Sequence, residues 1–208
     1  RIIPLVIEEE KMQKACEVAG KEPIFRILPY QKKKAGIVTT GSEVYYHRIE
    51  DKFTPVVIEK LKECGVTEVK QIQCNDDHEM ITEAIQTLIE DGSDLIVCTG
   101  GMSVDPDDRT PLAIKNACTE VVTYGAPVLP GAMFMLAYCE KEGRQIPVMG
   151  LPGCVMYAKR TIFDLVLPRI MCDEKLHEKD FRLLGQGGLC LSCPVCTFPN
   201  CGFGKGGY

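Results

Sequence analysis

Residues 95–101 read Leu-Ile-Val-Cys-Thr-Gly-Gly, an apolar run that passes through one threonine into a pair of glycines. Four consecutive apolar residues before a turn signal are typical of a strand that is covered on both faces, as in the centre of a parallel sheet. The two glycines predict a tight loop at the carboxyl end of this strand. We therefore expect an α/β domain built around residues 95–98.

Strand-like and helix-like segments alternate on both sides of this run. Strands are predicted at residues 37–39, 69–74, 121–122, 133–138 and 146–149. Helices are predicted at residues 54–64, 76–91 and 110–118, and a long one follows Gly153 and ends near Met171. Thr54, Asp76 and Asp107 are the expected helix N-caps. This alternation predicts an α/β fold with three layers, α/β/α, and a mostly parallel sheet.

The chain divides into three parts by composition. We expect residues 1–34 to form an N-terminal segment or the remnant of a preceding domain, because they are too few to hold a core. Residues 35–172 carry the alternating pattern and form the main domain. Residues 173–208 form a tail that is rich in cysteine.

Composition restricts the class of function. The 208 residues are 45% hydrophobic and carry a formal net charge of −5, which favours a globular protein and argues against a nucleic-acid surface. No apolar stretch approaches the roughly 20 residues that cross a bilayer, and no signal peptide precedes the first strand. We expect a cytoplasmic protein that binds neither nucleic acid nor membrane.

Three predicted strands end in loops that contain glycine. These loops are Thr40-Gly41-Ser42, Gly100-Gly101-Met102-Ser103 and Leu151-Pro152-Gly153. In an open parallel sheet, ligands bind outside the carboxyl ends of the strands, and glycines let backbone N–H groups approach an oxyanion closely. The three loops together predict a site for a phosphorylated small molecule, whereas any one of them alone is more typical of a tight turn.

Acidic residues follow the same loops. Asp105, Asp107 and Asp108 come just after the double glycine, and Glu43 and Asp51 lie after the first strand. A Mg²⁺ ion would reconcile these carboxylates with a phosphate, because both are its usual ligands. Helix capping is the alternative, and we favour it for Asp107.

At these residues the chain resembles the molybdopterin-binding domain family. This family includes molybdopterin molybdenumtransferase of the MoeA type, molybdopterin adenylyltransferase and the matching domains of gephyrin. Residues 39–44, Thr-Thr-Gly-Ser-Glu-Val, are similar to the family motif S/T-T-G-D-E-L. Residues 99–104 with Asp108 are similar to S-G-G-V-S-x-G-x-x-D, and Gly150-Leu151-Pro152-Gly153 is similar to G-L-P-G-N-P. The order and spacing of the three motifs over residues 35–172 carry the resemblance, which looks closest to the molybdenumtransferase.

The resemblance implies a role in molybdenum cofactor biosynthesis, often as a homo-oligomer. The ligand would be molybdopterin or adenylyl-molybdopterin, into which molybdate is inserted with Mg²⁺, and Asp108 would be the catalytic acid that holds this ion. The substrate-binding residues it implies are Thr40, Gly41, Ser42, Glu43, Thr99, Gly100, Gly101, Met102, Ser103, Pro130, Gly131, Leu151, Pro152 and Gly153. A non-catalytic carrier or sensor of molybdopterin is the alternative, and a protein acting on a nicotinamide-type dinucleotide is a third.

Several positions depart from the family pattern. Ser42 stands where the transferase usually has an acid, and Leu129-Pro130-Gly131-Ala132 stands where it has Lys-Pro-Gly-Lys. Cys154 and Tyr157 replace its usual Asn and Ser. Because molybdate is an anion that needs cationic or hydrogen-bonding partners, these changes bear on molybdate insertion more than on pterin binding.

The cysteines fall into two groups. Eight of the twelve are scattered through helix and strand patterns and are expected to be small buried side chains in a reducing compartment. The other four are Cys190, Cys193, Cys196 and Cys201. Their spacing predicts a metal site, either a tetrahedral Zn²⁺ or an iron–sulfur cluster such as [4Fe-4S].

Overall fold

A computed structural model of the chain describes residues 5–23 and 25–206. Parts of the predicted N-terminal segment (residues 1–4 and 24) and of the tail (residues 207–208) therefore lie outside the described residues. Within the described part, one six-stranded sheet has the order β2-β1-β3-β6-β5-β4. Its strands are β1 (Lys34–Thr40), β2 (Glu68–Cys74), β3 (Leu95–Thr99), β4 (Glu120–Tyr124), β5 (Met135–Lys141) and β6 (Arg144–Leu151).

The sheet is mostly parallel, as predicted. Strands β2, β1, β3 and β6 run parallel to one another, and β5 pairs antiparallel with both β6 and β4. The run at residues 95–98 forms most of β3 near the centre of the sheet, and all five residues of this strand are buried. A strand that is covered on both faces needs apolar side chains at every position, which explains why this run is continuous.

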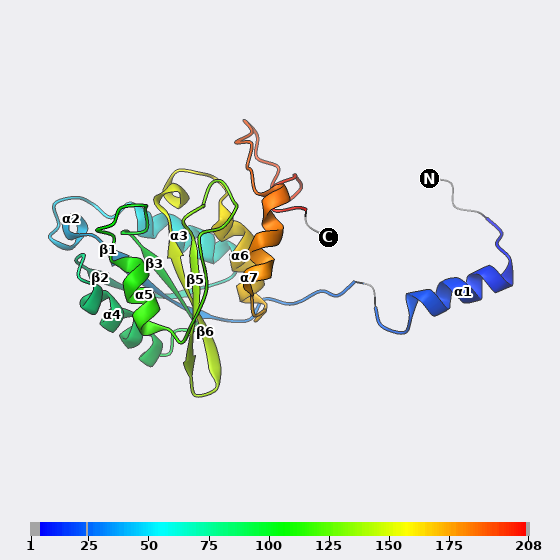
Figure 1. The fold of residues 1–208 in the computed structure, drawn as a ribbon, viewed down its shortest axis with the longest axis horizontal. Helices are drawn as coiled ribbons and strands as arrows, with labels where there is room; N and C mark the ends of the chain where they lie inside the picture. The colour runs from blue at the N-terminus through cyan, green and yellow to red at the C-terminus, as the bar shows by residue number, and fades with distance from the viewer. Residues whose placement is uncertain (1–4, 24, 207–208) are drawn as a thin grey trace.

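Helices cover both faces of the sheet (Figure 1). On one face, α4 (His78–Glu90) and α5 (Thr110–Ala117) pack on the side chains of Ile96 and Val148. On the other face, α3 (Phe53–Glu63), α6 (Ile162–Met171) and α7 (Glu178–Leu183) share a core with Val97 and Met149. The three layers therefore follow from the alternation of side chains along each strand.

The N-terminal helix stands apart from the domain (Figure 1). Helix α1 (Glu9–Ala19) has no buried residue, which is consistent with its many charged side chains. Residues 28–33 lead into the domain, where the Gln31 N–H donates to the carbonyl of Met171 at 2.8 Å and Lys33 pairs with Asp173. Before β1 begins at Lys34, the described residues add no strand to the sheet and no buried residue to its core.

The predicted N-caps at Thr54, Asp76 and Asp107 are wrong. Thr54 lies inside α3, and Asp51 takes the capping role by accepting hydrogen bonds from the N–H groups of Phe53 and Thr54. Helix α4 is capped by Asp77, which accepts from the N–H groups of Glu79 and Met80. Helix α5 begins after Arg109 without a side-chain cap.

The long helix predicted after Gly153 is also wrong. The chain forms one 3-10 turn, η1 (Gly153–Met156), and then runs irregularly to Thr161 before α6 begins. Thr161 and Asp164 form a capping box, in which the Thr161 hydroxyl accepts from Phe163 N–H and the Asp164 carboxylate accepts from Thr161 N–H. The reciprocal bonds satisfy the first N–H groups of α6 and fix its start.

The C-terminal region packs on the same core as the main domain. Phe181 on α7 stacks on Phe134 with ring centroids 5.9 Å apart, and Phe203 is only 4% exposed. Between them, η2 (Leu184–Gly187) leads to Leu189, which pairs with Leu129 in a parallel bridge. A boundary at residue 172 therefore does not separate two cores.

Candidate functional site

Three parallel neighbours in the sheet bring their loops to one edge. Strand β3 lies between β1 and β6, and the register pairs Thr99 with Thr39 on one side and with Leu151 on the other. The carboxyl ends of the three strands are therefore level. The loops that begin at Gly41, Gly100 and Pro152 leave the sheet side by side, as expected for a ligand site in an open α/β sheet.

The turn after β3 lies directly against the end of β1. Gly100 has a φ of +86°, and a Cβ atom built there would lie 2.3 Å from the carbonyl oxygen of Thr40. The Thr110 hydroxyl donates to the carbonyl of Gly100 at 2.9 Å and lies 3.2 Å from the Thr40 hydroxyl. Since Thr110 has one hydroxyl proton, Thr40 must be the donor in their shared bond. Only glycine allows this close approach, and hydrogen bonds of the buried Thr40 and Thr110 hydroxyls hold the turn in place.

One polar atom at this edge has no partner. The hydroxyl of Thr99, at the last position of β3, is fully buried and makes no hydrogen bond among the described residues. A buried hydroxyl without a partner is costly, and in native structures it commonly reflects a water, an ion or a ligand group. Thr99 thus marks the end of the central strand as a place for such a group.

An apolar groove opens beside this turn. Its volume is about 500 Å³, and three loops line it: residues 102–104 after β3, residues 129–133 and residues 152–154 after β6. Met102, Ser103, Pro130, Gly131, Pro152 and Gly153 are the predicted site residues that line it. Leu189 and Cys190 complete the wall, although no motif in the sequence predicts that they reach this groove. The lining contains no charged side chain, so the groove suits the apolar faces of a ligand.

The loop after β1 lies beside the groove without lining it. Ser42 and Glu43 begin the short helix α2 (Ser42–Tyr45), and the Ser42 N–H donates to the Asp76 carboxylate at 2.8 Å. Asp76, predicted as a helix cap, instead fixes this loop. Glu43 is exposed.

The acidic residues hold their own loops in place. The Asp108 carboxylate accepts a hydrogen bond from Ser103 N–H, and the Asp105 carboxylate accepts from Asp107 N–H at 3.0 Å. Burial and the negative charge of Asp108 raise the pKa of the nearby Tyr124 phenol. The loop between β3 and α5 is thus shaped by carboxylates that bind backbone N–H groups.

Asp51 is engaged in the same way. Burial raises the pKa of its carboxyl group, but hydrogen bonds from Thr54, Phe53 and Gln71 outweigh burial, and the net pKa is lowered. Across residues 5–23 and 25–206, no three His, Cys, Asp or Glu side chains gather in an arrangement that would hold a metal ion. Asp51 and Asp108 each accept hydrogen bonds from backbone N–H groups, and their role as Mg²⁺ ligands stays a prediction.

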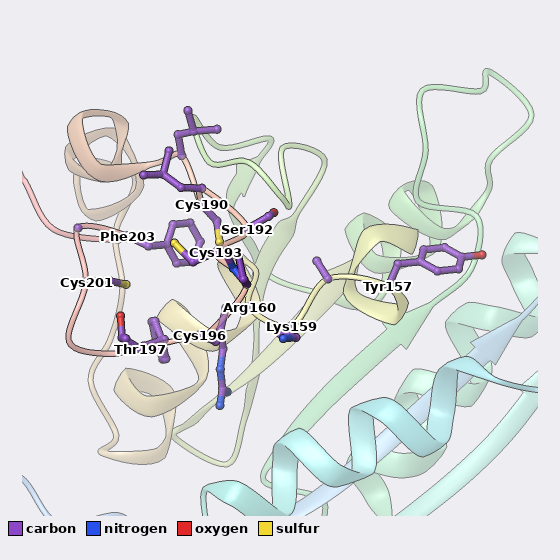
Figure 2. A pocket seen from close by; sticks show the side chains of 16 residues that line it. Tyr157, Lys159, Arg160, Cys190, Ser192, Cys193, Cys196, Thr197, Cys201 and Phe203 are labelled. Carbon is purple, nitrogen blue, oxygen red and sulfur yellow. The ribbon is translucent and has the colours of Figure 1, made fainter.

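The four tail cysteines surround a second cavity (Figure 2). This cavity of about 390 Å³ lies between residues 157–160 and residues 189–203, and Cys190, Cys193, Cys196 and Cys201 all line it. The four thiols are free. Leu189 and Cys190 line both this cavity and the groove, so the two spaces share a wall.

The fold is an α/β domain with an apolar groove at the carboxyl ends of its parallel strands. The chain belongs to the family described as "probable molybdopterin binding domain", whose profile matches residues 36–171. A CinA-like protein of Mycobacterium tuberculosis (strain ATCC 25177 / H37Ra) is 35% identical over 85 residues, which are 41% of this chain and 20% of that protein. The chain thus matches about a fifth of the length of such relatives.

Solved structures share the fold. The tungsten cofactor synthesizing protein MoaB from Pyrococcus furiosus superposes with a TM-score of 0.51 at 22% identity, over 60% of this chain and 84% of that one. A putative molybdenum cofactor biosynthesis protein from Corynebacterium diphtheriae superposes with a TM-score of 0.55 at 14% identity, over 69% and 97%. The expected closeness to the molybdenumtransferase stays a prediction.

In the described residues, no helix is long and apolar enough to span a bilayer.

Proposed function

We propose that this chain binds molybdopterin or adenylyl-molybdopterin in the groove and serves molybdenum cofactor biosynthesis. The observation that carries the proposal is the meeting of three glycine loops beside one apolar groove, in a chain that belongs to this family. The names of the two solved relatives, which refer to tungsten and molybdenum cofactor synthesis, support the same conclusion.

The groove and the turn suit the two halves of such a ligand. A pterin is a flat ring system, and apolar side chains such as Met102, Val104 and Leu129 offer it contact surface. The phosphate would meet the glycine turn at residues 100–101. Helix α5 begins at Thr110, whose hydroxyl binds this turn, so the positive end of the helix dipole adjoins it.

The absence of cations from the groove favours binding over insertion of molybdate. Residues 129–132 line the groove as Leu-Pro-Gly-Ala, and neither Lys nor Arg is among its lining residues. Backbone N–H groups can hold a phosphate, but molybdate needs a stronger set of donors. A carrier or sensor of molybdopterin is therefore the function that the geometry supports best.

A bulky side chain at Gly153 is expected to block the groove. A Cβ atom at Gly153 would meet nothing within 4 Å, so Gly153→Leu can fold without strain and place its side chain at the groove wall. We expect binding of molybdopterin, measured anaerobically by calorimetric titration, to weaken by at least ~10-fold, about 1.4 kcal/mol. Gly153→Ala is the matched control and should bind like the original chain.

Equal affinity in the leucine and alanine variants would place the ligand elsewhere. Their thermal unfolding midpoints should agree with that of the original chain, which shows that folding is not the cause of any loss. The same titration with a nicotinamide-type dinucleotide tests the third candidate ligand.

Insertion of molybdate is the second candidate function, and the position of Asp108 favours it. Asp108 lies on the loop that also supplies Met102, Ser103 and Val104 to the groove. Mg²⁺ is commonly bound by one or two carboxylates together with substrate phosphates, so Asp108 would be its protein ligand here. This role is part of the proposal.

Release of AMP from adenylyl-molybdopterin, with molybdate and Mg²⁺, tests this function. Asp108→Ala removes both the charge and the acceptor for Ser103 N–H, whereas Asp108→Asn keeps an acceptor and removes the charge. If Asp108 acts through its charge, both variants should lose at least ~100-fold in rate, a loss typical of removing one catalytic group. Loss in the alanine variant alone would show a structural role, and unchanged rates in both would exclude Asp108 from catalysis.

A further inference from the structure

We propose that Cys190, Cys193, Cys196 and Cys201 hold a metal centre through their thiolates, in the cavity shared by residues 157–160 and 189–203. This proposal does not depend on what the groove binds. It rests on where the chain fixes the two ends of the cysteine loop, on the cavity that the thiols line, and on their spacing.

The cysteine loop is pinned at both ends. At its start, Leu129 N–H donates to the Gly188 carbonyl at 2.6 Å, and Cys190 N–H donates to the Leu129 carbonyl at 2.8 Å. At its end, Gly204 N–H donates to the Gly187 carbonyl at 2.7 Å, and the neighbouring Phe203 is buried in the core. The loop is thus held against the domain at residues 188–190 and 203–204.

The side chains beside the loop support the same site. Cys190 and Cys201 are half-buried and pack against the core, whereas Cys193 and Cys196 are exposed. Arg160 lies over the Phe198 ring at 5.1 Å, and both residues line the cavity together with Lys159.

The four sulfurs surround the cavity without closing on one point, because no set of three ligands is gathered among the described residues. Cys193 and Cys196 lie within residues 191–197, which are exposed throughout, and the proposal has this segment move to bring the sulfurs together. Leu191 and Val195 in this segment are each 77% exposed, so they are not part of the apolar core. Two fixed thiols and two on an exposed loop can therefore converge when an ion or a cluster enters.

The spacing matches thiolate metal sites. Cys190, Cys193 and Cys196 each lie three residues apart, and Cys201 follows after four intervening residues. Repeated spacing of this kind is found in proteins that hold iron–sulfur clusters, and four thiolates also satisfy a tetrahedral Zn²⁺. The metal centre proposed here is one or the other, and its composition separates them.

Metal analysis of the full chain, purified without oxygen, tests the proposal. We expect about one zinc ion per chain with no colour, or about four iron atoms with sulfide and a broad visible absorption. Cys193→Ser and Cys196→Ser should each lose at least ~10-fold in metal content or affinity. Because both side chains are exposed, these variants should keep the thermal unfolding behaviour of the metal-free protein.

Two cysteine variants outside the set are the matched controls. Cys16→Ser alters an exposed thiol on α1, and Cys154→Ser alters a thiol that lines the groove but not the tail cavity. Both should retain the full metal content. The proposal is overturned if the chain holds no stoichiometric metal after anaerobic addition of Zn²⁺ or of iron and sulfide, or if the controls lose metal equally. Disulfides among the four tail cysteines in the oxygen-free protein would also overturn it.

Discussion

Replacing Gly100 by alanine is expected to lower the free energy of unfolding by about 2–5 kcal/mol and to abolish ligand binding in the groove. Two costs combine at this position. A φ of +86° is left-handed backbone that costs an L-residue roughly 1–2 kcal/mol, and the new Cβ would lie 2.3 Å from the Thr40 carbonyl oxygen. Such overpacking costs roughly 1–3 kcal/mol of unfolding free energy. Thr40 cannot easily move away, because its strand β1 pairs with β2 on one side and β3 on the other.

Gly92→Ala is the matched control for this prediction. Gly92 has a φ of +85°, and a Cβ atom there would meet nothing within 4 Å. The free energy of unfolding of this variant should fall only by the backbone cost, roughly 1–2 kcal/mol. Urea unfolding monitored by circular dichroism measures it. The difference between the two variants measures the contact between the turn after β3 and the end of β1. Similar losses in both would mean that this contact does not constrain the site.

Asp164→Ala is expected to cost about 3–5 kcal/mol of unfolding free energy, the range for breaking a buried ion pair from one side. The Lys60 Nζ lies 2.7 Å and 2.9 Å from the two carboxylate oxygens, and the two side chains are only 9% and 4% exposed. Asp164 also accepts from Thr161 N–H at the start of α6 and pairs with Arg160. Its removal would leave a buried ammonium group unpaired and a helix end without its cap.

Two further variants separate these contributions in the same urea titration. Asp91→Ala breaks an exposed pair with Lys70 and should change stability by less than ~1 kcal/mol. The double variant Lys60→Met with Asp164→Leu removes both buried charges and should be more stable than Asp164→Ala alone. If the double variant is the less stable of the two, the unpaired charge is not the main cost.

The sequence predicted the sheet well because strong local signals marked its strands. The continuous apolar run at residues 95–98 and the glycines after it identified a central strand, and the structure places that strand between β1 and β6. Helix starts were predicted less well. Asp76 and Asp77 both suit an N-cap chemically, and only the geometry of the loop decides that Asp77 caps the helix while Asp76 binds Ser42 N–H.

The break before α6 had a readable signal. Thr161 and Asp164 have the spacing of a capping box, so residue 162 could have been predicted as the helix start in place of a continuous helix from Gly153. The wall formed by Leu189 and Cys190 had no such signal. It depends on a backbone pairing with Leu129, sixty positions earlier, which neither periodicity nor composition reveals.

Phe203 shows that the family domain and the apolar core have different limits along the chain. The family profile ends at residue 171. The apolar core does not end there, because Phe181 and Phe203 fill space against residues that lie inside the profile, among them Phe134. The segment that matches the family profile is therefore shorter than the segment that shares one apolar core.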